Sequence, residues 1–216
     1  MRNNRSFIAS FAFVVMVVVA PGLAHAQGMT ESVASEPQIW LGGHVGLSPI
    51  GTLKATAKAN GNEASDSVDS ATAFELGAHV DFKIMPFLSV GLAPALLFHV
   101  KGQDDTDSAS QLDLPIRVTA GGNVMPQLRI YGFVAPGYTF LFPPADSMGN
   151  SDRLSGFMVG FGGGVGFHVA PRFAVTGELG YQFRFPSETQ TVLGTPVDVT
   201  LQDNFLTFAI GVVAGL

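Results

Sequence analysis

The chain of 216 residues contains no cysteine, which excludes a disulfide framework, thiolate catalysis and cysteine-based metal sites. It also has few charged residues: 11 Lys and Arg stand against 17 Asp and Glu, and together they make up only 13% of the chain. The resulting formal net charge of −6 makes nucleic acid a poor candidate partner. Outside the extreme N-terminus, no apolar run reaches the ~18 residues that a membrane-spanning helix needs.

The chain is nevertheless hydrophobic, with 47% hydrophobic residues, 18 Phe and a mean hydropathy of +0.34. This composition is too apolar for a disordered protein, and the length suits one domain. The sequence thus combines the hydropathy of a membrane protein with a body that lacks a spanning helix. Any account of the fold has to explain both properties.

The N-terminus has the pattern of a secretory signal peptide. Arg2 and Arg5 provide a basic start, an apolar run follows over residues 7–20, and Ala24-His25-Ala26 places small residues at a cleavage site. We predict a signal peptide over residues 1–26 that is cleaved between Ala26 and Gln27. A retained N-terminal anchor helix is the disfavoured alternative, because the apolar run is short.

Residues 27–37 are polar and show no periodic pattern, so we expect a short leader there. From residue 38 to residue 216 the dominant pattern has period two, which is typical of strands whose two faces meet different environments. In residues 74–84, for example, apolar side chains occupy every even position. The pattern predicts eight strands, at about 38–48, 73–84, 88–101, 111–124, 128–141, 154–169, 173–185 and 201–216.

Two kinds of connection alternate between the predicted strands. Three are very short, and each contains a proline after an apolar residue and a Met or Ala: Pro86, Pro126 and Pro171. The segments after them are similar, which makes an internal hairpin repeat. Four connections, near 49–72, 102–110, 142–153 and 186–200, are longer and polar, and we expect loops there. Short and long connections both fit antiparallel neighbours.

Eight alternating strands fit either a soluble barrel or sandwich, with its apolar face inside, or a membrane barrel, with its apolar face outside. A 12-residue strand rises about 40 Å, and a tilt of ~45° reduces this to about 28 Å, close to the ~25 Å apolar band of a membrane barrel. The polar face is also rich in small residues, which suits a narrow barrel interior. These are Gly42, Gly46, Gly77, Gly91, Ala93, Ala95, Gly121, Gly160, Gly162, Gly164 and Gly166. We therefore predict an all-β fold, an eight-stranded antiparallel up-and-down transmembrane barrel.

With the secretory signal, three tight turns, four long connections and an end inside its last strand, the chain resembles the small outer-membrane barrels of the OmpA/OmpX type over residues 38–216. The resemblance implies a multi-pass protein in the outer membrane of a Gram-negative bacterium. It implies contact with lipid and lipopolysaccharide, and insertion by the barrel assembly machinery. We expect a monomer without a cofactor.

Two features depart from that family or from strand geometry. The last residue is Leu216, where such barrels usually end on an aromatic residue, and we expect no periplasmic peptidoglycan-binding domain. Pro94, Pro115 and Pro136 fall inside predicted strands, where each removes a hydrogen-bond donor, and we expect β-bulges at them.

The ionisable residues of the inward face occur at every height of the predicted barrel. Buried charges are tolerated only when they are paired and hydrogen-bonded. We therefore predict Glu/Arg and Asp/Lys pairs centred on Glu75, Arg117 and Glu178. The rest of this network is Asp81, Lys83, Arg129, Asp113 and Arg184. We interpret the network as a plug, with a gate or a narrow ion path as the alternative.

Metal binding is not favoured by the pattern. His44, His79, His99 and His168 all fall on the inward face, but no two share a strand at ligand spacing, and we expect their heights to differ. In the loops, Asp104, Asp105 and Asp107 form a weak candidate cation site, since carboxylates suit Ca²⁺. This cluster lacks the Gly and the closing Glu of an EF-hand loop, so solvated acid is the favoured interpretation.

An enzyme is disfavoured as well, although outer-membrane lipid-modifying enzymes of this size exist. A nucleophilic site needs a Ser beside a His and an acid, and no His-x-Ser motif occurs. The sequence therefore favours a structural or surface-contact role with a side-chain-filled lumen. A small-solute or ion channel is the alternative, and a lipid-modifying enzyme comes third.

Overall fold

The structure is a computed structural model that describes residues 38–69, 72–99, 109–142, 153–192 and 195–216. The predicted signal peptide and leader lie outside these residues, as do Asp104, Asp105 and Asp107. The described residues form β1 (Ile39–Ala59), β2 (Asn62–Asp69), β3 (Ala73–Met85), β4 (Leu88–Leu92), β5 (Ala95–His99), β6 (Ser110–Met125), β7 (Leu128–Phe142), β8 (Leu154–Ala170), β9 (Phe173–Val192) and β10 (Thr195–Gly215). None of these ranges contains a helix long and apolar enough to cross a membrane.

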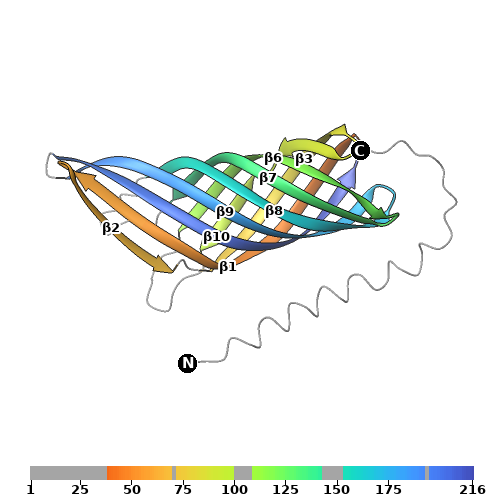
Figure 1. The fold of residues 1–216 in the computed structure, drawn as a ribbon, viewed down its shortest axis with the longest axis horizontal. Coiled ribbons are helices and arrows are strands. Elements are labelled where there is room, and N and C mark those ends of the chain that lie inside the picture. Colours follow the sequence, from red (N-terminus) through yellow and green to blue (C-terminus); the bar gives the residue numbers. More distant parts are fainter. Residues whose placement is uncertain (1–37, 70–71, 100–108, 143–152, 193–194) are drawn as a thin grey trace, which may run out of the picture.

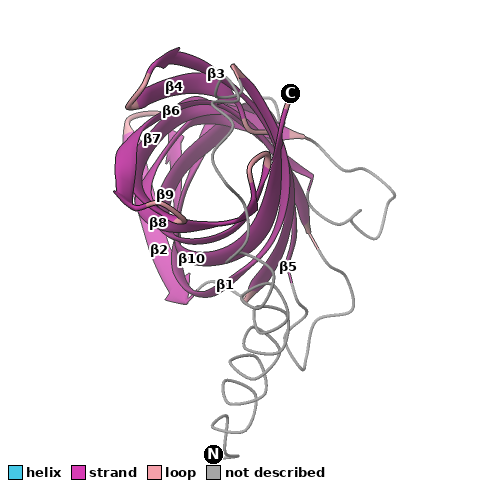
Figure 2. Ribbon diagram, turned by 90° about the vertical axis from the view of Figure 1, so that its right-hand side faces the viewer, coloured by secondary structure: helices cyan, strands magenta, loops and turns pink. Residues whose placement is uncertain are grey.

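The strands close into one antiparallel ring (Figure 2). Around the ring, β1 pairs with β10, and the order continues through β9, β8, β7 and β6 to β4 and β5, which pair with β3. β4 and β5 share one position in the ring, because both pair with β3 and with β6 in unchanged registers. Pairing of β1 with β3, from Ile39 opposite Phe82 to Ser48 opposite Ala73, closes the barrel. The predicted eight-stranded up-and-down barrel is confirmed.

The three proline-containing connections form three similar hairpins at one end of the barrel. Each has a two-residue turn that begins with Pro86, Pro126 or Pro171. A one-residue register shift precedes each turn, next to Met85, Met125 and Ala170. Proline suits the first central position of a β-turn because its ring fixes φ near −65°. The repeat in the sequence is therefore a repeat of one turn geometry.

The mid-strand prolines do not cause the expected bulges, and that prediction was wrong. Pro115 and Pro136 lie in unshifted registers opposite Gly137 and Val159. Pro94 separates β4 from β5, yet its carbonyl still accepts a 3.0 Å hydrogen bond from the backbone of Ala78. Each proline can remain extended and lose only its own donor, so no extra residue is needed. The register shift between Leu47 and Ile50, where β1 pairs with β10, instead spans Pro49.

Two of the connections predicted to be loops are mostly strand, which is a second correction. β1 continues to Ala59, turns at Asn60 and Gly61, and pairs with β2, while β9 and β10 continue to Val192 and from Thr195. Residues 52–69, 186–192 and 195–202 thus form an extended sheet in the order β2, β1, β10, β9, which projects from the ring at the end opposite the proline turns (Figure 1). Asn60 and Gly61 have φ of 50° and 82°, the geometry of a two-residue hairpin turn.

The outer face of the ring is apolar. Large hydrophobic side chains are exposed on it, among them Leu76 at 49%, Ile116 at 52% and Leu179 at 49%. Inside the barrel, Ala73, Ala95 and Leu97 form a small buried hydrophobic cluster. Soluble monomers rarely expose contiguous apolar patches beyond a few hundred Å². The apolar face therefore meets lipid, which explains the membrane-like hydropathy of a chain built from strands.

The extended sheet lies outside this apolar band. On the outward face of β1, Leu41 and Val45 in the ring give way to Thr52, Lys54 and Lys58 in the extension. The same change occurs on β9 and on β10. A strand of 21 residues, such as β1, rises about 70 Å, or about 50 Å when tilted by ~45°, against an apolar band of ~25 Å. The extension therefore stands in water.

Candidate functional site

The layer of the lumen nearest the extended sheet is filled by a buried ion pair. Arg184 of β9 is completely buried, and its Nη2 and Nε lie 2.7 and 2.8 Å from Asp113 Oδ2 of β6. Asp203 of β10 lies 3.9 Å from Arg184 Nη1, and the guanidinium lies over the ring of Phe205. Because β6 and β9 are separated by β7 and β8, this ion pair crosses the lumen.

Neutral side chains complete the outer layer. Thr139 Oγ1 donates a 2.7 Å hydrogen bond to Asp113 Oδ1, and Gln111 Nε2 donates a 2.8 Å bond to Thr139 Oγ1. Gln182 accepts a hydrogen bond from Arg184. Gln111, Asp113, Thr139 and Arg184 are each at most 1% exposed, so the lumen is filled at this level.

A second ion pair crosses the middle of the lumen. Arg117 Nη2 of β6 lies 2.6 Å from Glu178 Oε1 of β9, and Tyr131 Oη donates a 2.7 Å hydrogen bond to the same oxygen. The Arg117 guanidinium also lies 4.3 Å from the centre of the Phe133 ring. A cation over an aromatic face gains electrostatic stabilisation. Arg117 of β6 is thereby held by side chains of two other strands, β7 and β9.

Glu75, placed by the sequence at the centre of the charge network, contacts histidine rather than arginine. Its Oε1 lies 2.9 Å from His44 Nε2, and its Oε2 accepts a 3.4 Å hydrogen bond from Gln182. The rings of His44 and His79 stack with centroids 6.3 Å apart. In the pairing of β1 with β3, His44 lies opposite Gly77 and His79 lies opposite Gly42. Within the described ranges, no group of three or more metal-ligating side chains is assembled.

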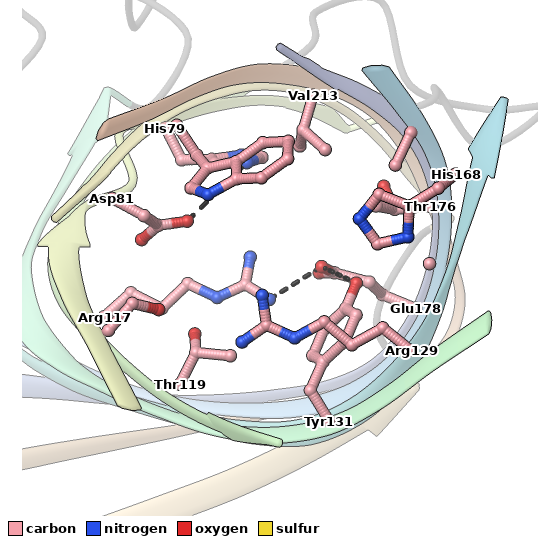
Figure 3. Close-up of a pocket in the computed structure, with 14 residues that line it drawn as sticks. His79, Asp81, Arg117, Thr119, Arg129, Tyr131, His168, Thr176, Glu178 and Val213 are labelled. Carbon is pink, nitrogen blue, oxygen red and sulfur yellow. Dashed lines mark hydrogen bonds and ion pairs between the residues drawn. The ribbon is translucent and has the colours of Figure 1, made fainter. Parts of the chain in front are cut away.

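The layer of the lumen nearest the proline turns holds other charged residues of the predicted network, among them Asp81 and Arg129 (Figure 3). Asp81 Oδ2 lies 3.8 Å from His79 Nε2, and Arg129 lies 6.0 Å from the centre of the Tyr131 ring. His168 packs edge-on against Trp40. Lys83 is half-buried, one inward position nearer the turn than Asp81.

Two small cavities, each of about 60 Å³, lie along the lumen. One lies toward the proline turns and is bordered by Trp40, Asp81 and Arg129. The other is bordered by His44, Glu75 and Asp113. Arg117 and Glu178 border both cavities, so their ion pair lies between them. The lumen is therefore divided by one cross-lumen ion pair and closed above the second cavity by another.

Inward glycines provide the space for the lumen rings. A Cβ added at Gly42 would lie 2.3 Å from the His79 ring, and one at Gly77 would lie 2.2 Å from the His44 ring. Likewise, a Cβ at Gly164 would lie 2.7 Å from the Tyr131 ring. These three inward glycines therefore lie directly against large polar side chains of neighbouring strands.

We expect Gly42→Ala to destabilise the barrel by about 1–3 kcal/mol, because the added methyl group overpacks the buried His79 ring and Val213. Gly43→Ala is the matched control. Gly43 follows Gly42 in the chain but faces outward, and a Cβ added to it would lie 3.7 Å from the nearest atom, the carbonyl oxygen of Gly77. Urea-induced unfolding in lipid vesicles measures the stability of both variants. Equal stability of the two variants would contradict this packing.

Several residues of the lumen network were not predicted as site residues. Gln111, Tyr131, Thr139 and Gln182 supply hydrogen bonds to the charged groups. The signal for them is present in the sequence, since each has the same period-two phase as a charged residue on its own strand. A prediction based on charged residues alone therefore misses the neutral side chains that hydrogen-bond to them.

The architecture can now be compared with known proteins. A family model for the outer membrane protein beta-barrel domain matches residues 11–213. The chain belongs to this family. Membership places the barrel in the outer membrane, in agreement with its apolar outer face. No curated protein matches the chain significantly.

Solved structures support the same fold. Neisserial surface protein A is 12% identical with a TM-score of 0.50, over 81% of this chain and 97% of that chain. The outer membrane protein OprG from Pseudomonas aeruginosa is 11% identical with a TM-score of 0.51, over 81% of this chain and 95% of that chain. At this level of identity the likeness concerns the fold alone.

Proposed function

We propose that the barrel is a non-conducting outer-membrane protein that presents the extended sheet at the cell surface for contact with other macromolecules, and that it contributes to envelope integrity. The observation that carries this proposal is the continuation of β1, β9 and β10 beyond the apolar band, where β10 keeps one unbroken register with β9 from Ala214 to Thr195. Rigid strands hold this surface in place. Binding surfaces on a rigid scaffold are a common arrangement.

The closed lumen supports a role outside the barrel. Passage of a solute would require both cross-lumen ion pairs, Arg117–Glu178 and Arg184–Asp113, to separate. Breaking a buried pair is costly because each charge is left without compensation. The second candidate function is a small-solute or ion channel, and the two cavities along the lumen are the observation that favours it.

A non-enzymatic role is part of the proposal. The buried hydroxyl of Ser48 shares a 2.8 Å hydrogen bond with Thr207, and the hydroxyl of Ser155 lies 3.4 Å from that of Tyr138. Both serines thus contact a hydroxyl group and not the histidine that a nucleophilic site requires.

The exposed edge of the sheet indicates how contact would occur. β2 lies at the end of the described strand order and carries Glu63, Asp66 and Asp69. Charged residues on an edge strand oppose aggregation through further strand pairing. Lys58 and Glu63, 3.0 Å apart, are both more than half exposed. A partner would be recognised through polar and charged groups, with little burial of apolar surface.

The proposal includes the export and surroundings of the protein. A signal peptide cleaved after Ala26 would deliver the chain for insertion by the barrel assembly machinery of a Gram-negative bacterium. The monomer would then contact lipid and lipopolysaccharide through its apolar face, with the proline turns in the periplasm and the extended sheet outside.

Single-cysteine labelling tests this orientation, because the chain has no cysteine of its own. We expect Ser65→Cys on β2 to react with a membrane-impermeant maleimide on intact cells. Arg172→Cys, in the exposed turn after Pro171, is the matched control and should react only after the outer membrane is permeabilised. Labelling of Arg172→Cys but not of Ser65→Cys on intact cells would overturn the proposal.

A further inference from the structure

The cavity near the proline turns has the composition of a ligand site. It holds about 60 Å³, which corresponds to about four water molecules at ~15 Å³ each. A tetrahedral ion with four oxygen atoms needs a similar volume. Side chains from several strands converge on it, among them Asp81 of β3, Arg117 of β6 and Arg129 of β7 (Figure 3).

Five buried polar atoms of residues that line this cavity have no hydrogen-bond partner among the described residues. They are His79 Nδ1, Asp81 Oδ1, Arg117 Nε, Thr119 Oγ1 and His168 Nδ1. His79, Arg117 and Thr119 are each less than 10% exposed. Buried polar groups are normally satisfied, and one left without a partner destabilises the fold. Their concentration around one cavity indicates that the cavity holds a polar occupant.

The charges around the cavity favour an anionic occupant. Figure 3 shows the guanidinium groups of Arg117 and Arg129 directed into the same space. One of the two carboxylates that line the cavity, Glu178, already accepts hydrogen bonds from Arg117 and Tyr131. Arg117 Nε and the Arg129 guanidinium are therefore available to a further oxygen ligand. The planar donor array of arginine matches oxyanions such as phosphate and carboxylate.

Asp81 narrows the choice of anion. This carboxylate lines the same cavity and its Oδ1 has no hydrogen-bond partner, so an ion without a proton, such as sulfate or chloride, would be repelled there. An oxyanion that carries a hydroxyl group can instead donate a hydrogen bond to this carboxylate while its other oxygens accept from the guanidinium groups. Orthophosphate has both properties at neutral pH, because it retains a proton on one oxygen.

We propose that this cavity is a binding site for orthophosphate, with Arg117, Arg129 and Thr119 as donors to the phosphoryl oxygens and Asp81 as the acceptor of the phosphate hydroxyl. The site opens toward the proline turns, where Trp40, Arg129 and His168 are half-buried. On the other side, the Arg117–Glu178 ion pair separates it from the second cavity. It is therefore at the opposite end of the barrel from the extended sheet.

Trp40 provides a direct test, because it is the only tryptophan of the chain and borders the cavity. The refolded protein in detergent micelles, at constant ionic strength, is titrated with orthophosphate, sulfate or dimethyl phosphate. Dimethyl phosphate represents a lipid phosphodiester, which has no phosphate hydroxyl. We expect saturable changes in Trp40 emission and calorimetric heat with orthophosphate, at least tenfold weaker binding of sulfate, and none of the diester.

Three variants locate the binding. Arg129→Gln should weaken orthophosphate binding at least tenfold, while Arg172→Gln, in the exposed turn at the same end, should bind like the wild type. Asp81→Asn should reduce the preference for orthophosphate over sulfate. Heat-modifiable gel mobility confirms that each variant is folded, and the comparison of anions on the wild type needs no variant.

Absence of saturable binding by both fluorescence and calorimetry would overturn the proposal. Equal affinity of the wild type for orthophosphate and sulfate would overturn it as well, as would unchanged binding in folded Arg129→Gln. Binding of dimethyl phosphate as tight as that of orthophosphate would overturn the role of Asp81 and indicate a lipid headgroup as the occupant.

Discussion

Replacement of Arg184 by methionine should destabilise the barrel by about 3–5 kcal/mol, measured by urea-induced unfolding in lipid vesicles. Arg184 is fully buried, and its removal leaves the carboxylates of Asp113 and Asp203 in the lumen without the cation that compensates them. Loss of one partner of a buried ion pair typically costs this much. Gln182 also loses the donor of a hydrogen bond.

Two comparisons separate this effect from loss of side-chain volume. The double variant Arg184→Met with Asp113→Asn should recover part of the stability, because it removes one uncompensated charge but keeps the shape of residue 113. Lys58→Met removes a cation from an exposed ion pair with Glu63 and should cost less than about 1 kcal/mol. Equal effects of Arg184→Met and Lys58→Met would contradict a lumen closed by charge pairing.

An arginine on the outer face at mid-barrel should be nearly as damaging. Leu179 lies midway along the ring portion of β9 and is 49% exposed. In a membrane barrel, Leu179→Arg places a charge in the hydrocarbon layer, which costs about 2–4 kcal/mol at the bilayer midplane. In a soluble barrel the same substitution would only add a charge to the surface.

The same strand provides the control. Thr189 faces the same side of β9 but lies in the extended sheet, where its hydroxyl donates a 2.7 Å hydrogen bond to Asp198. Thr189→Arg should change the stability in vesicles by no more than about 0.5 kcal/mol. A Leu179→Arg variant as stable as Thr189→Arg would show that the apolar face does not meet lipid.

The sequence predicted those parts of the fold that depend on local pattern. The period-two alternation identified every strand of the ring and its inward face, and the proline repeat identified three hairpins. The extension of β1 into β2 was missed, although Asn60-Gly61 between alternating residues is among the strongest short-range hairpin signals. The bulges expected at Pro94, Pro115 and Pro136 are absent because extended proline loses one donor without requiring an extra residue.

The pairing of charges across the lumen could not be predicted in the same way. The alternation places Glu75, Arg117 and Glu178 inside, but the partner of each depends on the stagger between strands on opposite sides of the ring. That stagger brings Arg117 to Glu178 and leaves Glu75 with His44. The strand sequences, read one at a time, contain no information about this offset.

The most direct test of the account is the conductance of the refolded protein in a planar lipid bilayer, with heat-modifiable gel mobility as the check of folding. Because two buried ion pairs cross the lumen, we expect no steady openings from the wild type at neutral pH. Steady wild-type openings that bulky substitutions at Gly162 or Gly164 abolish would contradict the closed lumen and identify the barrel as a channel.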